Sequence, residues 1–219
     1  MKFVIALVVV LVVAALIRKI VRYKTLTPLL PRKYNFGKRR DTLREVLRLL
    51  DERGAKVLVE TGVARMGLEK SKGDGASTIV FGLWSTQNDA HLYSVDIDPE
   101  ATAKAGEAVN AMELGDHVTL VTSDSVAYLA DFTDAVDFLY LDSYDYHKTD
   151  TSIQQASQAH HLKEIEAIEG CLHDGTVILI DDCDMPNGGK GKLVIERLTA
   201  NGWTVHMSEY QVILLRDAG

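Results

Sequence analysis

Residues 176–184 read TVILIDDCD, a short apolar run that gives way to three carboxylates within four residues. An uninterrupted run of β-branched and aliphatic residues predicts a strand that is covered on both faces, as in a parallel sheet. Four earlier runs have the same form and also lead into polar residues: KVLVE (56–60), HLYSVD (91–96), HVTLVT (117–122) and VDFLYL (136–141). Segments with helical spacing separate these runs, so strand and helix alternate along the chain.

This alternation predicts an α/β fold of the Rossmann-like, doubly wound type. Two further strands, Trp203–Met207 and Gln211–Leu215, lie close enough in sequence to form an antiparallel hairpin. We therefore expect a mostly parallel sheet with an antiparallel last strand, in one domain that extends over residues 41–219.

Charge is distributed unevenly over the 219 residues, whose formal net charge is −7. Residues 1–40 contain ten Lys or Arg and no Asp or Glu, so the remainder is strongly acidic. An acidic body argues against nucleic acid as a partner, because phosphate binding needs a basic face. A hydrophobic content of 47% argues against a disordered chain, and two cysteines are too few for a disulfide scaffold.

Residues 1–22 contain the segment FVIALVVVLVVAALI (3–17), which has no polar side chain. Its fifteen residues span about 22 Å as a helix, and extension of Arg18 and Lys19 toward the interface lengthens the span to about 28 Å. We expect a single-pass transmembrane anchor here; a cleaved signal peptide and a buried core helix are the alternatives. Residues 23–40 are then a basic juxtamembrane linker, and the positive-inside rule leaves the folded body in the cytoplasm.

The polar residues after the strands predict a ligand site, because ligands of such folds bind beyond the carboxyl ends of the strands. Glu60, Thr61 and Gly62 end the first run, and a glycine-rich segment then leads through Gly75 to Ser77 at the start of a helix. A glycine turn before a helix N-terminus suits an anion such as a pyrophosphate or a carboxylate. A capped surface turn is the alternative.

A carboxylate at the end of the second run, Asp96, can accept hydrogen bonds from both hydroxyls of a ribose. Asp98 is a candidate for the same role or for capping the next helix, since Pro99 follows it. Ser123, Asp124 and Ser125 follow the third run. Together these features predict a nucleoside-containing cofactor.

In its order of motifs the chain resembles the class I S-adenosylmethionine-dependent methyltransferases, from about Val57 to Leu215. Glu60–Gly62 is similar to the family's first motif, Asp96 to its ribose-binding acid, and Ser123–Ser125 to the segment that flanks the adenine. The resemblance implies S-adenosylmethionine as the cofactor. The glycine run is longer than the family's, with eleven residues between Gly62 and Asp74, and the G-x-G-x-x-G motif of nicotinamide-dependent oxidoreductases is absent.

Three carboxylates, Asp142, Asp181 and Asp182, follow the fourth and fifth runs. This pattern resembles the metal-dependent O-methyltransferases, such as those that act on catechol, cephalosporins or sugars. The resemblance implies that the three residues bind Mg²⁺ or a similar divalent cation, which would lower the pKa of a bound acceptor hydroxyl. The alternative is that Asp181 and Asp182 only cap a loop.

Four residues are candidates for the proton acceptor: His147, Lys148, His160 and His161. A histidine titrates near neutral pH and suits general base catalysis, although most surface histidines have no such role. The loop Tyr144–Gln158 is expected to cover the acceptor. The glycine-rich segment 188–192 is interpreted as a flexible loop rather than as a phosphate site.

The predicted function is methyl transfer from S-adenosylmethionine to a hydroxyl of a small-molecule, sugar or lipid-linked acceptor at the membrane. One alternative is a metal-free methyltransferase that uses His160 or His161 as its base. Another is a membrane-tethered, catalytically silent scaffold with the same fold. A homo-oligomer is compatible with each of these.

Overall fold

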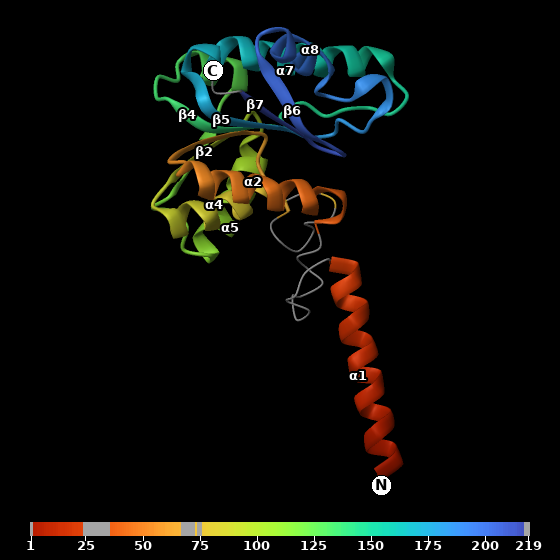
Figure 1. The fold of residues 1–219 in the computed structure, drawn as a ribbon. Helices are drawn as coiled ribbons and strands as arrows, with labels where there is room; N and C mark the ends of the chain where they lie inside the picture. The colour runs from red at the N-terminus through yellow and green to blue at the C-terminus, as the bar shows by residue number, and fades with distance from the viewer. Residues whose placement is uncertain (1, 24–35, 67–72, 74–75, 217–219) are drawn as a thin grey trace. The chain divides into compact units, whose positions relative to one another are not determined.

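The computed structural model describes residues 2–23, 36–66, 73 and 76–216 (Figure 1). The chain divides into two compact units, Met1–Asn35 and Phe36–Gly219, each of which is described by itself. In the first unit the described residues form one helix, α1 (Lys2–Tyr23).

The transmembrane anchor that the sequence predicts over residues 1–22 is not found. No helix among the described residues is long and apolar enough to cross a membrane. Helix α1 has the predicted position, but its uninterrupted apolar part is only Phe3–Ile17. That part is about 22 Å long, against a hydrocarbon thickness of about 30 Å, and the remaining turns contain Lys2, Arg18, Lys19 and Arg22.

A seven-stranded sheet forms the centre of the second unit, in the order β3-β2-β1-β4-β5-β7-β6. Five strands are parallel: β1 (Val57–Thr61), β2 (His91–Asp96), β3 (Val118–Thr122), β4 (Val136–Leu141) and β5 (Leu172–Ile180). The last two, β6 (Trp203–Ser208) and β7 (Val212–Arg216), form an antiparallel hairpin, and β7 also runs antiparallel to β5. The predicted α/β sheet with an antiparallel end is confirmed.

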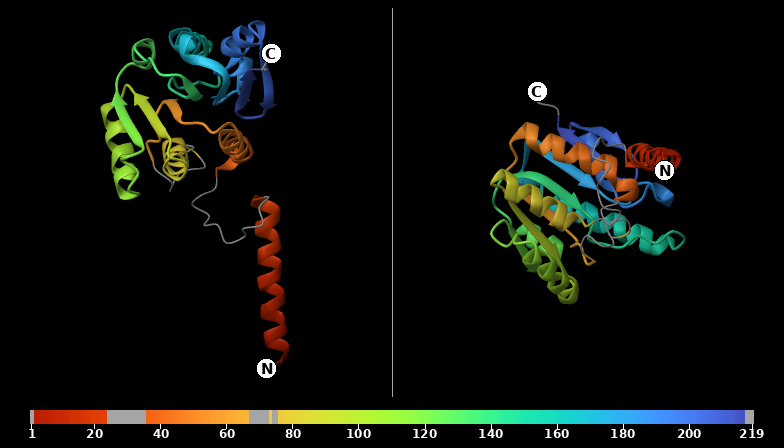
Figure 2. Two further views of the ribbon diagram at one scale, coloured as in Figure 1. Left: turned by 60° about the vertical axis from the view of Figure 1, so that its left-hand side comes forward. Right: turned by 90° about the horizontal axis from the view of Figure 1, so that it is seen from below.

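Helices cover both faces of this sheet (Figures 1 and 2). One layer consists of α2 (Arg40–Arg53), α4 (Ser77–Asn88) and α5 (Pro99–Ala111), and the other of α6 (Ser125–Ala130), α7 (Thr151–Ile168) and α8 (Lys192–Ala200). Short turns of 3-10 helix, η2 (Gly37–Arg39), η4 (Glu169–Cys171) and η5 (Pro186–Gly188), adjoin these elements. Side chains of β5 alternate between the layers, because Val177 and Leu179 belong to one core cluster and Ile178 and Ile180 to the other.

Helix α7 begins earlier than the sequence predicts, within the segment Tyr144–Gln158 that is expected to be a loop. The carboxylate of Asp150 caps the helix by accepting hydrogen bonds from the amides of Ser152 (2.9 Å) and Ile153 (3.3 Å). The first two turns are mostly polar, so no apolar periodicity reveals them in the sequence. His160 and His161 therefore lie in the middle of a helix.

Candidate active site

The residues directly after the parallel strands continue the hydrogen-bond ladder of the sheet and therefore lie side by side. The amide of Gly62 donates to Val95 (2.8 Å), and the amide of Asp142 donates to Thr61 (2.9 Å). Gly62 has a φ of +87°, and a Cβ at this position would lie 2.5 Å from the carbonyl oxygen of Asp142. A glycine is needed here because the turn after β1 passes the end of β4 so closely.

Glu60 is fully buried at the end of β1 and connects this turn to the neighbouring elements. Its Oε2 accepts hydrogen bonds from Thr78 (2.7 Å) and Ser94 (2.5 Å). Thr78 Oγ1 in turn accepts from the amide of Ala64 (2.8 Å), so the carboxylate orders the loop after β1. Ser77 is buried at the first position of α4, whereas the predicted Gly75 lies outside the described residues.

Asp96 joins the end of β2 to the same turn. Its Oδ2 accepts from the amide of Val63 (3.1 Å) and its Oδ1 from the amide of Asp98 (2.9 Å). The side chain is only 9% exposed, and the two hydrogen bonds fix its position. The ends of three adjacent strands thus meet at this edge of the sheet, with Asp96 at the end of β2, Gly62 after β1 and Asp142 after β4.

The other acidic candidates at this edge cap helices. Asp98 accepts from the amide of Glu100 (2.9 Å) at the start of α5, and Asp124 accepts from Ala127 (2.9 Å) at the start of α6. Ser123 is half-buried beside Asp124. Because Asp98 already has this structural role, Asp96 is the better candidate for a ribose.

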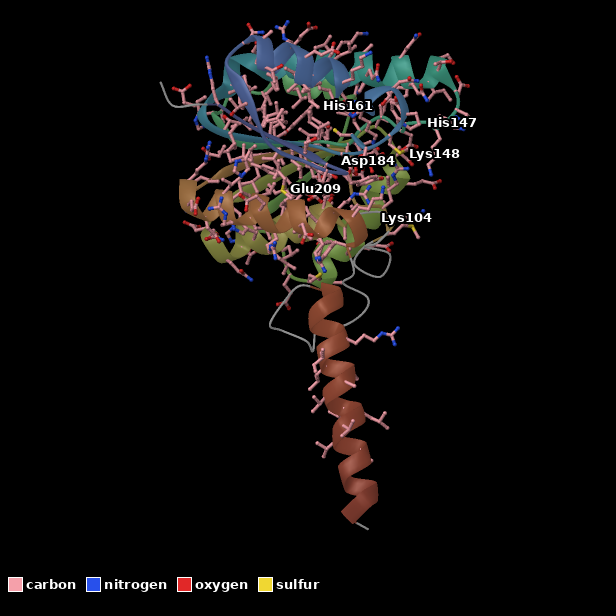
Figure 3. All side chains as sticks on the ribbon, turned by 45° about the vertical axis from the view of Figure 1, so that its right-hand side comes forward. Lys104, His147, Lys148, His161, Asp184 and Glu209 are labelled. Atoms are coloured by element: carbon pink, nitrogen blue, oxygen red, sulfur yellow. The ribbon has the colours of Figure 1, made fainter. Side chains whose placement is uncertain are left out.

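The predicted proton acceptors do not gather at one point. His147 and Lys148 are exposed at the outer edge of the domain (Figure 3), where His147 Nδ1 accepts from the amide of Asp150 (2.9 Å). His161 is fully buried, with Nδ1 2.7 Å from the carbonyl oxygen of Ser157, and burial lowers its pKa to about 4. The first pair stabilises a surface turn, and the buried imidazole stays neutral at neutral pH.

His160 connects α7 to the start of α6. Its Nε2 lies 3.0 Å from Oγ of Ser125 and 3.5 Å from Oε1 of the fully buried Glu164. The nearby carboxylate of Glu164 raises the pKa of His160, and burial opposes this shift. Both partners contact the same ring nitrogen, so the three residues do not form a relay in which the carboxylate orients the opposite nitrogen.

Asp142, Asp181 and Asp182 converge, as their positions after neighbouring strands predict, with one ligand atom of each within 4.8 Å of the others. We call these three residues the acidic cluster. Two buried cations of the chain lie against it. Arg39, 8% exposed, donates to Oδ2 of Asp181 from Nη2 (2.6 Å) and Nε (2.9 Å), and Nε also reaches Oδ1 (3.1 Å). Lys190, 2% exposed, donates to Oδ1 of Asp142 and lies 3.3 Å from Oδ2 of Asp182.

Every oxygen of the acidic cluster therefore has a hydrogen-bond donor or a cation of the chain beside it. The two oxygens that accept no hydrogen bond from Arg39 and form no ion pair with Lys190 accept hydrogen bonds from hydroxyls: Oδ2 of Asp142 from Tyr140 (3.3 Å) and Oδ1 of Asp182 from Tyr210. Oδ1 of Asp182 also lies 3.9 Å from Nη2 of Arg39. A divalent cation would have to displace Lys190 and would leave a buried ammonium beside it, which is strongly unfavourable. The donor set does not fit a divalent cation while these two side chains keep their positions.

The acidic cluster has one negative charge in excess of its two cations when all groups are ionised. Burial and the charge of Asp181 raise the pKa of Asp142 well above its usual range, although Lys190 opposes this shift. At Asp181 burial also favours the neutral form, but Arg39 and Lys190 outweigh it and hold the pKa below its usual value. Asp142 is also the more accessible carboxylate, since its side chain is 21% exposed and that of Asp181 is fully buried. These surroundings therefore favour the protonated form of Asp142 more than that of Asp181.

Lys190 reaches the carboxylates because the segment before α8 passes very close to the residues after β5. A Cβ at Gly189, whose φ is +60°, would lie 2.0 Å from the carbonyl oxygen of Asp182. A Cβ at Gly191 would lie 2.7 Å from Sγ of Cys183. The segment 188–192, interpreted from the sequence as a flexible loop, is packed into the site.

Arg39 also lies in a segment to which the sequence assigns another role. It falls within the predicted linker of residues 23–40, but Gly37–Arg39 form η2 in the second unit and lead directly into α2. Neither buried cation is among the site residues predicted from the sequence.

A cavity of about 550 Å³ opens beside the acidic cluster. Tyr210 belongs to its wall and also donates to Asp182, and an ion pair between Lys38 and Asp184 (2.9 Å) lies in the same wall. The remaining lining residues come from the start of α2, the residues after β5 and the turn between β6 and β7: Gly37, Asp41, Cys183, Ser208 and Glu209. Charged and hydroxyl groups predominate, so the cavity suits a polar small molecule.

Residues 72–183, just over half of the chain, match a family model described as a methyltransferase domain. The matched segment contains Asp96, Asp124, Asp142, Asp181 and Asp182. No curated protein matches the chain.

Several solved structures have a similar fold. A protein from Staphylococcus aureus described as a candidate caffeoyl-CoA O-methyltransferase is 14% identical, with 81% of this chain and 84% of that chain covered and a TM-score of 0.58. The methyltransferase PaMTH1 of Podospora anserina, solved with bound SAH, is 15% identical, with 94% and 88% covered and a TM-score of 0.60. A methyltransferase from Geobacter sulfurreducens is 18% identical, with 94% and 88% covered and a TM-score of 0.54. At these identities the likeness is one of fold.

Proposed function

Because the chain belongs to the methyltransferase-domain family whose model it matches, we propose that it methylates a hydroxyl oxygen of a polar small molecule or sugar. It is a class I S-adenosylmethionine-dependent methyltransferase. The choice of oxygen as the methylated atom is supported by the similarity to the Staphylococcus aureus protein. The observation that carries the proposal is the placement of Asp96 and Asp142 on either side of the turn after β1.

We place S-adenosylmethionine over this turn. Asp96 is held by backbone amides at both oxygens, and each oxygen keeps a further lone pair for a ribose hydroxyl. Ser123–Ser125, at the end of β3, are then candidates for contact with the adenine, and Gly62 for the amino acid part. The bound SAH in the Podospora anserina relative supports a cofactor of this type.

The acceptor is proposed to bind in the cavity beside Tyr210, with its hydroxyl directed toward Asp142. In the transfer step a bond forms between the acceptor oxygen and the methyl carbon while the bond from that carbon to sulfur breaks. The hydroxyl proton passes to Asp142, and S-adenosylhomocysteine leaves. Protonation of Asp142 removes the excess negative charge of the acidic cluster, which favours this residue as the base.

Calorimetric titration of the full chain with S-adenosylmethionine tests the cofactor site. Asp96→Asn should weaken binding about tenfold or more, since it removes a charged acceptor from the ribose. Asp98→Asn is the matched control, because asparagine caps a helix as well as aspartate does. Wild-type protein that binds neither S-adenosylmethionine nor S-adenosylhomocysteine would contradict the proposal.

A metal-assisted form of the reaction is the second candidate. The convergence of three carboxylates favours it, since Mg²⁺ prefers oxygen ligands. The contacts of Arg39 and Lys190 with all three carboxylates oppose it. Methyl transfer that is lost on dialysis against a chelator and restored by Mg²⁺ would favour the metal-assisted form.

A further inference from the structure

We propose that Lys190 is a built-in cation that takes the position of a divalent metal in the acidic cluster, and that removing its ammonium group converts the cluster into a metal site. The wild-type chain is then expected to bind no Mg²⁺ at these residues. The evidence for this inference is the charge and the geometry of the cluster. Only its consequence for methyl transfer rests on the proposed function.

The contacts of Lys190 are those expected of a structural cation. Its ammonium group bridges two carboxylates, Asp142 and Asp182, while the third, Asp181, is paired with Arg39. A lysine with a side chain only 2% exposed is stable inside a protein when carboxylates surround it. Burial lowers the pKa of Lys190, but the three carboxylates outweigh burial and raise the pKa above its ordinary value, so the side chain stays charged.

The backbone on either side of Lys190 is held in place from two directions. The buried Gln158 of α7 donates to the carbonyl oxygens of Gly189 (3.0 Å) and Asn187 (3.1 Å). The amide of Lys190 donates to the carbonyl oxygen of Asp182 (3.3 Å). The ammonium group is thus presented to the carboxylates by an ordered segment, and not by a surface side chain that happens to fold inward.

Loss of the ammonium group would leave the same carboxylates with one cation, Arg39, and two negative charges in excess. Oδ1 of Asp142 and Oδ2 of Asp182 would lose their cationic partner, and the cluster's ligand atoms lie within 4.8 Å of one another. Two carboxylates with space for water beside them are a typical donor set for Mg²⁺ or Mn²⁺.

The test is calorimetric titration of the full chain with MgCl₂ or MnCl₂, which needs neither cofactor nor acceptor. Wild-type protein is expected to give no heat of binding, and Lys190→Ala is expected to bind one ion. Thermal unfolding provides a second readout, in which metal at about a hundred times its Kd should raise the Tm of Lys190→Ala by about 5 °C or more. Lys192→Ala is the matched control, since Lys192 is exposed only two residues away and should behave as wild type.

A second substitution shows whether the metal binds at the acidic cluster. Asp182→Asn in the Lys190→Ala background should abolish the gained binding. If Lys190→Ala is unfolded without metal, recovery of its circular dichroism signal on addition of Mn²⁺ supports the proposal as well.

Three outcomes would overturn it: a wild-type chain that binds Mg²⁺ and loses this binding through Asp182→Asn, a folded Lys190→Ala that binds no metal, or a Lys190→Ala that stays unfolded with metal. Absence of methyl transfer in all variants would count against the proposed function and would leave the metal titration unaffected.

Discussion

Lys190 and Asp142 form a buried ion pair between the segment before α8 and the end of β4, 48 residues apart in sequence. A second buried pair, Arg39 with Asp181, joins the start of α2 to the end of β5 across 142 residues. The two pairs connect elements of both helical layers to the same edge of the sheet. The charges of the acidic cluster therefore contribute both to the stability of the fold and to the proposed reaction.

Arg39→Ala should destabilise the protein by about 3–5 kcal/mol, because it leaves the fully buried carboxylate of Asp181 without its main partner. Chemical denaturation monitored by circular dichroism measures this difference in the free energy of unfolding. Arg44→Ala is the matched control on α2, since Arg44 is 66% exposed and lies 3.8 Å from Asp41. An exposed pair of this kind contributes about 0–1 kcal/mol. Equal effects of the two substitutions would contradict the buried pairing.

The kcat of methyl transfer should increase with pH as Asp142 loses its proton, which gives an ascending limb in the plot of kcat against pH. The general base must be ionised to accept the hydroxyl proton, and burial together with Asp181 raises the pKa of this carboxyl above its usual range. Asp142→Asn should lower kcat by about 10²–10⁴-fold.

Lys190 opposes the shift at Asp142, so its removal should raise the pKa of Asp142 further. The same limb should then move to higher pH in Lys190→Gln, as measured from the pH dependence of kcat. A limb that stays in place in Lys190→Gln, or that persists in Asp142→Asn, would show that another group is the base.

The fold could be predicted from the sequence because its signals are local. Each parallel strand contains a mostly apolar run of five or six residues that is visible on its own, as in VDFLYL at 136–141 and TVILI at 176–180, although β5 itself begins earlier, at Leu172. The carboxylates that follow these runs must share one edge of a parallel sheet, so the convergence of Asp142, Asp181 and Asp182 follows from topology.

The two cations of the site could not be predicted in the same way, because their partners are distant in sequence. Arg39 stands in the basic run KRR at 38–40, and nothing in that run distinguishes the buried arginine from its exposed or half-buried neighbours. For Lys190 a signal was present: glycines on both sides indicate a close backbone approach. The same glycines are also typical of a flexible loop, and only the contact with Asp182 and Cys183 separates the two interpretations.

Gly189→Ala should destabilise the protein and displace Lys190. A residue other than glycine at a φ of +60° and a ψ of −163° costs about 1–3 kcal/mol, and the added Cβ would also meet the carbonyl oxygen of Asp182 at 2.0 Å. We expect a loss of more than about 2 kcal/mol in the free energy of unfolding together with reduced methyl transfer. Gly170→Ala, where a Cβ would meet no atom within 4 Å, is the control. A Gly189→Ala variant as stable as that control would contradict the close packing of this segment.

His161 should make the protein sensitive to mild acid. Burial lowers the pKa of His161 from 6.5 to about 4 in the folded state, so below pH 6.5 the unfolded chain takes up a proton that the folded chain does not. Stability should therefore fall as the pH decreases from about 6.5 toward 4, by about 3 kcal/mol in total. Glu164, whose pKa is lowered mainly by His160 and His161 against the effect of burial, adds a further loss only below its ordinary value of 4.5.

Urea unfolding of His161→Gln across this pH range measures the contribution, and glutamine keeps a side-chain donor for the carbonyl oxygen of Ser157. The variant is expected to lose the slope between pH 6.5 and 4.5, whatever its stability at neutral pH. His147→Gln, on the exposed turn before α7, is the control that retains the buried imidazole and should retain the slope. If both variants keep the slope of the wild type, the acid sensitivity arises from a group other than His161.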